Sequence, residues 1–152
     1  MLIFTKEDLL FDKFNSKELK QTKLFRSLII LLLFVNGLGA LFAGYGFILE
    51  PNGSFIGLDK SILIHSPFHD FLIPGISLLI FNGLSSLYVL WQFAKKTSIA
   101  NCSLFIQGLL SCGWITIQVI MLRSFNFLHV IFGIIGLAFL ISGYQLIKRK
   151  LR

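Results

Sequence analysis

The chain has 152 residues, of which 55% are hydrophobic and only 14% charged, with a formal net charge of +7 and a mean hydropathy of +0.82. A soluble domain of this size buries only about two thirds of its surface and has about a quarter of its residues charged, so this composition argues against a soluble fold. The basic residues lie at the ends of long apolar runs, which argues against a nucleic-acid surface. We therefore predict an all-α membrane protein whose partner is the lipid bilayer and not nucleic acid.

The first residues form a charged leader before the apolar runs begin. Residues 1–23 carry charges of both signs, with Leu9, Leu10, Phe11 and Phe14 among them. We predict a cytoplasmic leader that is partly an amphipathic helix lying on the inner membrane surface. An arm that binds a protein partner is the alternative.

Four long segments without Asp, Glu, Lys or Arg follow, each of at least 23 residues. About 20 helical residues are enough to cross a hydrocarbon core of about 30 Å, and a helix satisfies its own backbone hydrogen bonds in lipid. We predict a polytopic four-transmembrane-helix bundle over residues 24–152, with spans at about 24–49, 71–94, 97–122 and 124–147.

The distribution of Lys and Arg predicts the orientation of these spans. Twelve of the fourteen basic residues lie before the first span, between the second and third, or after the fourth. Only Lys60 and Arg123 lie on the other side. Because basic residues are enriched in cytoplasmic segments, we expect both termini to be cytoplasmic.

The outer connection, Glu50 to Asp70, is the only sizeable segment between spans. Its first residues, Glu-Pro-Asn-Gly, are typical of a turn that closes the first helix. The next helix begins either at Ser66, as a cap followed by proline, or later with Asp70 as the cap. Pro74 then falls in the first turns of that helix, where a kink is an open alternative.

An amide side chain precedes glycine in three successive spans, at Asn36–Gly37, Asn82–Gly83 and Gln107–Gly108. An amide in hydrocarbon needs a hydrogen-bond partner, so these side chains are expected to face the bundle interior. Small residues also form stripes on the first and fourth spans, at Gly39, Ala43, Gly46, Gly133, Gly136 and Gly143. Such Gly/Ala faces allow close helix packing, either within the bundle or against a protein partner or a second copy of the chain.

The third span carries a polar stripe, in which successive members are three or four residues apart: Ser103, Gln107, Ser111, Trp114 and Gln118. At 100° per residue these side chains share one helix face. The stripe, with Asn36 and Asn82, would line a hydrated cavity or a binding groove. Alternatively, its members bond to the two asparagines in a packed core.

The outer segment holds the one group of potential metal ligands, His65, His69 and Asp70. Two imidazoles and a carboxylate are zinc ligands in many proteins. Pro67 interrupts their helical spacing, however, and nothing in the pattern positions them, so we expect polar residues at the membrane interface. We predict no cofactor.

Residues 66–75, Ser-Pro-Phe-His-Asp-Phe-Leu-Ile-Pro-Gly, resemble a stretch of a widespread, uncharacterised family of small four-helix bacterial membrane proteins. The likeness extends over about residues 36–144 and includes Gly83, Trp114 and Gln118. It implies the same topology in a bacterial cytoplasmic membrane. It implies no catalytic residue, because the family has no assigned activity.

These observations favour an integral membrane protein with a structural, regulatory or accessory role. A small transporter, or a protein that binds lipid or another small molecule along the polar stripe, is the alternative. An enzyme is less favoured because the span interiors contain no acid, base or histidine for proton transfer or nucleophilic attack.

Overall fold

The computed structural model describes residues 6–123 and 126–150, with side chains from Lys23 to Arg149. These residues form helices, turns and loops and contain no β-strand. Four helices are long and apolar enough to cross a membrane: Lys23–Leu49, Leu72–Lys95, Ala100–Leu122 and Phe127–Arg149. The predicted all-α fold and the four long apolar helices are confirmed, with boundaries shifted by a few residues. Residues 1–5 of the leader and the start of the fourth predicted span, 124–125, lie outside the described residues.

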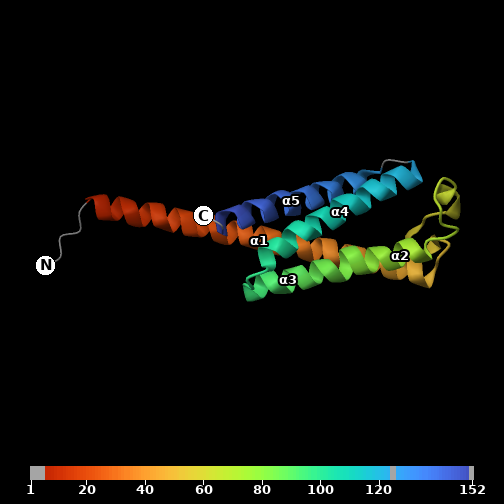
Figure 1. Ribbon diagram of the computed structural model, residues 1–152, viewed down its shortest axis with the longest axis horizontal. Coiled ribbons are helices and arrows are strands. Elements are labelled where there is room, and N and C mark those ends of the chain that lie inside the picture. Colours follow the sequence, from red (N-terminus) through yellow and green to blue (C-terminus); the bar gives the residue numbers. More distant parts are fainter. Residues whose placement is uncertain (1–5, 124–125, 151–152) are drawn as a thin grey trace.

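The first helix, α1, runs without a break from Lys6 to Leu49. The leader was predicted to be partly an amphipathic helix at the inner membrane surface. Its described part is helical, continues the first apolar helix in the same direction and extends beyond the other helices (Figure 1), and its position relative to a membrane stays a prediction. Charged and apolar residues both favour helix here, and no glycine or proline separates the two parts.

The loop after α1 contains two short 3-10 helices, η1 (Ser54–Ile56) and η2 (Lys60–Leu63). Gly53 has a φ of 89° and donates its N–H to the carbonyl of Glu50 at 2.9 Å, so the predicted turn is confirmed. The backbone N–H of Leu72 donates to Asp70 Oδ1 at 3.0 Å, and the next helix begins at Leu72. The helix thus begins at the later of the two predicted positions, although its N-cap residue is Phe71 and not Asp70.

The second long helix has three parts: α2 (Leu72–Leu78), the π-helical η3 (Leu79–Leu84) and α3 (Ser85–Lys95). Pro74 lies in the first turn of α2. Backbone N–H groups in the first turn have no acceptor within the helix, so a proline there removes no helical hydrogen bond. The irregularity of this helix therefore lies at η3 and not at the proline. A π-helical segment is rare and occurs often at functional sites.

Two further helices, α4 (Ala100–Leu122) and α5 (Phe127–Lys150), complete the fold. The turn between α3 and α4 is tight. Each preceding helix ends at a basic residue in the left-handed region, Lys96 with φ 56° and Arg123 with φ 44°.

The helices pack as two antiparallel hairpins. In the first hairpin α1 lies along α2, η3 and α3, and in the second hairpin α4 lies along α5. The two hairpins contact each other mainly where α4 passes α3 and η3. They diverge toward the end of the molecule that carries the η1–η2 loop (Figure 1).

Glycines bring the helices of each hairpin into close contact. A Cβ on Gly37 would lie 2.8 Å from Leu87, and one on Gly83 would lie 2.8 Å from Leu41. These two contacts are reciprocal. Leu41 follows Gly37 by four residues on α1, and Leu87 follows Gly83 by four residues on the second long helix. In the second hairpin a Cβ on Gly108 would lie 2.4 Å from the backbone nitrogen of Leu140. The amide–glycine pairs thus mark positions of internal helix packing.

The small-residue stripes serve different contacts. Gly39 faces Phe132 of α5, and Gly46 faces Phe55 of the loop. Gly136 lies against Cys112, and Gly143 lies against the backbone of Phe105. These four glycines are therefore used for packing inside the chain, and a role of these faces in oligomerisation stays a prediction.

Apolar side chains from all four long helices meet at the end of the bundle away from the loop. We call this group the four-helix core: Ile29, Leu33, Val89, Phe93, Ala100, Leu104, Ile135 and Phe139. At the opposite end, Phe47 stacks on Phe71 with ring centroids 4.7 Å apart, and Leu63 packs beside them. We refer to these two regions as the core end and the loop end.

Candidate functional site

A layer of polar side chains separates the core end from the loop end. Its five buried members, each at most 3% exposed, come from α1, η3, α3 and α4: Asn36, Asn82, Ser86, Gln107 and Ser111. A polar group buried without a partner is costly, so this layer is stable only where its members bond to one another. We call it the polar layer.

Within the first hairpin, the polar layer ties α1 to α3. Asn36 Nδ2 donates to Ser86 Oγ at 2.8 Å. Both residues lie beside the contact between Gly37 and Leu87, so close helix packing and the hydrogen bond occur at the same level.

Between the hairpins, the polar layer ties α4 to η3 and α3. Ser111 Oγ donates to Asn82 Oδ1 at 3.0 Å, and Gln107 Nε2 donates to Ser111 Oγ at 3.3 Å. Ser85 Oγ donates to Gln107 Oε1 at 2.7 Å. Three of the seven residues predicted to line a cavity, Asn82, Gln107 and Ser111, are therefore bonded to one another in a packed interior, as in the second alternative that the sequence left open.

The π-helical segment contributes to the same network. The carbonyl oxygen of Phe81 lies 2.5 Å from Ser85 Oγ, whose single proton it shares with Gln107 Oε1, and Gln107 Nε2 donates to the same carbonyl at 3.5 Å. A π-helical turn changes the i to i−4 ladder, which makes a backbone carbonyl available to side chains. The η3 segment thus brings both a backbone carbonyl and Asn82 to the contact with α4.

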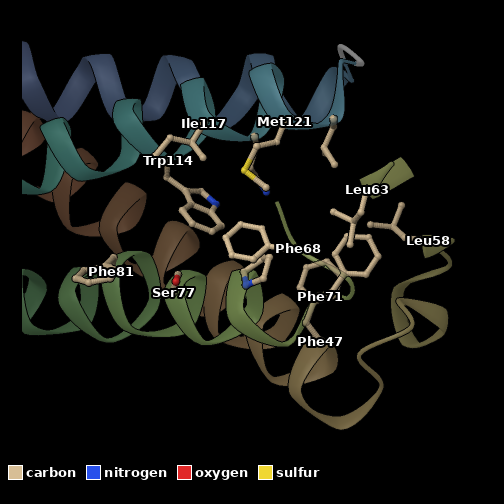
Figure 2. Close-up of a pocket in the computed structure, with 13 residues that line it drawn as sticks. Phe47, Leu58, Leu63, Phe68, Phe71, Ser77, Phe81, Trp114, Ile117 and Met121 are labelled. Carbon is tan, nitrogen blue, oxygen red and sulfur yellow. The ribbon is translucent and has the colours of Figure 1, made fainter. Parts of the chain in front are cut away.

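Above the polar layer, toward the loop end, the divergence of the hairpins leaves a cavity of about 320 Å³ (Figure 2). Its walls come from α1, the loop, α2, η3 and α4: Phe47, Leu58, Leu63, Phe68, Phe71, Pro74, Ser77, Phe81, Trp114, Ile117, Gln118, Met121 and Leu122. The volume falls within the range of about 300–1,000 Å³ that small-molecule sites occupy. We call it the interhairpin pocket.

The polar stripe of α4 is divided between the polar layer and the interhairpin pocket. Trp114 and Gln118 line the pocket, one and two turns beyond the bonded pair Gln107 and Ser111. Ser103 lies half-buried near the other end of α4 and lines neither. Asn36 bonds within the first hairpin and lies outside the pocket wall. The structure thus brings two of the seven predicted residues to a cavity.

Trp114 extends from α4 across the interhairpin pocket toward Phe68 (Figure 2). Its ring nitrogen Nε1 is buried, and it has no hydrogen-bond partner among the residues the structure describes. An indole N–H is a donor only, so it is satisfied by an acceptor and by nothing else. Trp114 is therefore the one wall residue with a buried, unused donor in the described part of the pocket.

The histidines and aspartates of the loop before α2 do not come together. His65 and His69 are exposed, while Asp70 accepts from the backbone of Leu72. Within residues 6–123 and 126–150, no group of three or more His, Cys, Asp or Glu side chains is placed to hold a metal ion. Hydrogen bonds from the Ser61 side chain and backbone lower the pKa of Asp59. The aspartates of this loop thus act in turns and helix starts.

Sequence reasoning missed the opposite wall of the pocket, which is formed by Ser77, Phe68 and neighbours from the loop and α2. It also missed Gln92, which is 1% exposed at the core end and has both amide atoms without a partner in the described chain. The abundance of phenylalanine in residues 47–81 was the available signal for an apolar site.

A scan against models of protein families finds no match, and searches of curated proteins and of solved structures also find none. The resemblance at residues 66–75 therefore stays a prediction, and the site is interpreted from its own geometry.

Proposed function

We propose that this chain is a multi-pass protein of the bacterial cytoplasmic membrane, with both termini cytoplasmic, that binds a lipid or another apolar small molecule in the interhairpin pocket. The observation that carries the proposal is the apolar cavity between two hairpins that are held together at their other end. A protein with only a structural role gains nothing from such a cavity, because an unfilled space in a core costs packing energy.

Membrane insertion is supported by the outward faces of the helices. Large apolar side chains that point away from the bundle are about half exposed on all four, for example Leu31, Tyr88, Leu109 and Ile134. A water-soluble protein rarely exposes so many adjacent apolar groups. A bilayer covers them without any protein partner, and it also delivers apolar molecules to a pocket between helices.

A structural or accessory role is the second candidate, and the polar layer is the observation that favours it. Interhelical hydrogen bonds between amides and hydroxyls are ordinary means of holding a helix bundle together in lipid. In that case the bundle presents its outer loop or its extended α1 to a protein partner.

Orientation is tested with single cysteines in a background in which Cys102 and Cys112 are replaced by serine. In intact cells a membrane-impermeant maleimide is expected to label Lys60→Cys in the outer loop. Lys96→Cys, in the opposite turn, is expected to react only after the cells are made permeable. Labelling of Lys96→Cys in intact cells would refute the proposed orientation.

Binding is tested by filling the pocket. Ser77→Phe places a ring in the cavity, whereas Ile76→Phe adds the same ring next to it on the exposed face of α2. Native mass spectrometry of protein extracted from its membrane is expected to show bound lipid-sized molecules for the parent chain and Ile76→Phe, and fewer for Ser77→Phe. A second filling variant on the other wall, Ile117→Trp, guards against a local folding defect. Equal binding by all four proteins would favour the structural role.

A further inference from the structure

We infer that the interhairpin pocket selects an uncharged apolar molecule that carries a carbonyl oxygen, and that Trp114 Nε1 donates the hydrogen bond that recognises this oxygen. The inference rests on the proposed function, because it specifies the chemical class of the molecule that the pocket binds. Trp114 is then a specificity-determining residue.

The size of the pocket limits the ligand. A cavity of about 150 Å³ takes one benzene molecule, so a volume of 320 Å³ accommodates about twice that, or roughly a dozen carbon atoms. This corresponds to one medium-length chain or a small ring system, and not to a whole phospholipid.

The chemistry of the walls excludes a charged group. None of the thirteen wall residues is Asp, Glu, Lys, Arg or His, and most are aromatic or aliphatic. Burying an ionised carboxylate, phosphate or ammonium here would leave it without a counter-charge, at a cost of several kcal/mol. The part of the ligand that enters the pocket is therefore neutral.

The unused donor adds a requirement for an acceptor. A saturated hydrocarbon leaves Trp114 Nε1 unpaired, whereas a ligand oxygen satisfies it, and only the second arrangement removes the penalty of a buried unpaired donor. Neutral carbonyl oxygens are strong acceptors that need no donor in return. The pocket therefore discriminates between two ligands of equal size by one hydrogen bond.

The position of Trp114 places that oxygen at the inner end of the pocket. Trp114 lies eight residues before the last residue of α4, Leu122, so about 12 Å of helix separates them. Both residues line the cavity, and Leu58 and Leu63 cover it on the loop side. The ligand thus enters with its carbonyl toward the polar layer and its apolar body toward the loop. A bilayer offers such a carbonyl either as an acyl ester of a membrane lipid or as a free apolar ketone or quinone.

The test uses two probes that differ in one oxygen, 2-undecanone and undecane, with the full chain in lipid nanodiscs. Calorimetric titration, corrected with empty discs, measures both dissociation constants for the parent protein and for Trp114→Phe, which keeps an aromatic ring but has no N–H. For each protein, the preference is the dissociation constant of undecane divided by that of 2-undecanone. This ratio is expected to be about fivefold to tenfold larger for the parent than for Trp114→Phe, which corresponds to one neutral hydrogen bond. Because partition of each probe into the discs is the same for both proteins, it cancels in this comparison.

Equal preference in the two proteins would overturn the inference while leaving the proposed binding function intact. If neither probe binds the parent, or if Ser77→Phe binds both as tightly as Ile76→Phe does, the proposed function itself fails. Trp91→Phe serves as the matched control, since Trp91 is half exposed on α3 outside the pocket, and its probe preference is expected to equal the parent's.

Repeating the titration in discs of ether-linked lipid, which has no ester carbonyl, separates the two sources. A higher ketone affinity in ether-linked discs supports the inference with lipid esters as competing ligands. An unchanged affinity supports it with a free carbonyl compound as the ligand.

Discussion

The core end and the loop end of the bundle are built from the same four helices, but they are packed differently. At the core end, side chains from all four helices interdigitate, and Leu33, Leu104 and Phe139 are completely buried. At the loop end, the two hairpins part, and a pocket lies between α2 and α4. The polar layer lies between the two regions and carries hydrogen bonds between the hairpins.

The difference shows how one bundle combines a stable interior with a cavity. Packing and interhelical hydrogen bonds hold the hairpins together at the core end and the polar layer. The loop end is then free to keep a cavity that a fully packed bundle would close. The following predictions test this division, from the largest expected effect to the smallest.

Deleting a side chain should cost far more in the four-helix core than at the wall of the interhairpin pocket. Phe139→Ala removes a ring that is 0% exposed in the four-helix core, and we expect a loss of about 3 kcal/mol of stability. Ile117→Ala, at the pocket wall, removes a side chain that is 50% exposed and should cost less than about 1 kcal/mol. Unfolding titrations in bicelles measure both. Equal costs would mean that the two ends do not differ in packing.

Adding a methyl group inside the second hairpin should also destabilise the fold. A Cβ on Gly108 would collide with the backbone of Leu140, so Gly108→Ala is expected to cost about 1–3 kcal/mol. Gly113 on the same helix has nothing within 4 Å of such a Cβ, and Gly113→Ala should be neutral or slightly stabilising. The same unfolding titration compares the two, and a neutral Gly108→Ala would contradict the close packing of α4 and α5.

One substitution at the core end should increase stability. Gln92→Met keeps the length of the side chain and removes an amide whose two polar atoms are buried without described partners. We expect a gain of about 1–2 kcal/mol. Gln145→Met, at an exposed position of α5, should change stability little. A loss of stability in Gln92→Met would show that this amide has a partner and that the core end is not purely apolar packing.

The polar layer should contribute a measurable but modest coupling between the hairpins. A double-mutant cycle of Asn82→Ala and Ser111→Ala is expected to give a coupling energy of about 0.6 kcal/mol, typical of interhelical hydrogen bonds in membrane proteins. The pair Asn82→Ala and Ser103→Ala should give none, because Ser103 lies outside the layer. A coupling energy near zero for Asn82 and Ser111 would show that the polar layer does not stabilise the contact between the hairpins.

The smallest effect concerns the loop that covers the pocket. Because Ser61 lowers the pKa of Asp59 in the folded loop, ionised Asp59 stabilises the loop above the unfolded pKa of about 3.9. This contribution is lost as the pH falls through the lower folded value. The amide proton shift of Ser61 should titrate in this range in the parent and stay constant in Asp59→Asn. An Asp59 that titrates at or above its ordinary pKa would contradict the hydrogen-bonded turn.

Several features were predictable because they depend on local sequence. The four apolar helices follow from the length of the uncharged runs, and the turn at Gly53 follows from its Pro-Asn-Gly sequence. The common face of Gln107, Ser111, Trp114 and Gln118 follows from helical spacing alone.

The interhairpin pocket and η3 were not predictable, because they depend on which helices are neighbours and on the angle between them. Helical spacing placed Ser111 and Trp114 on the same face, but only the divergence of the hairpins makes one of them a bonded residue and the other a pocket wall. The unbroken junction between the leader and the first span was also not predicted. The leader's amphipathic composition is compatible with a surface helix, yet no breaking residue separates it from the first apolar run.

The unbroken course of α1 has a structural consequence. A helix of 44 residues is about 66 Å long, and the part before the candidate span at Lys23 accounts for about 25 Å of it. Near its far end the same helix contributes Phe47 to the pocket wall. Residues 6–22 and the pocket residue Phe47 therefore belong to one continuous helix, and Asn36, which bonds to Ser86 of α3, lies between them.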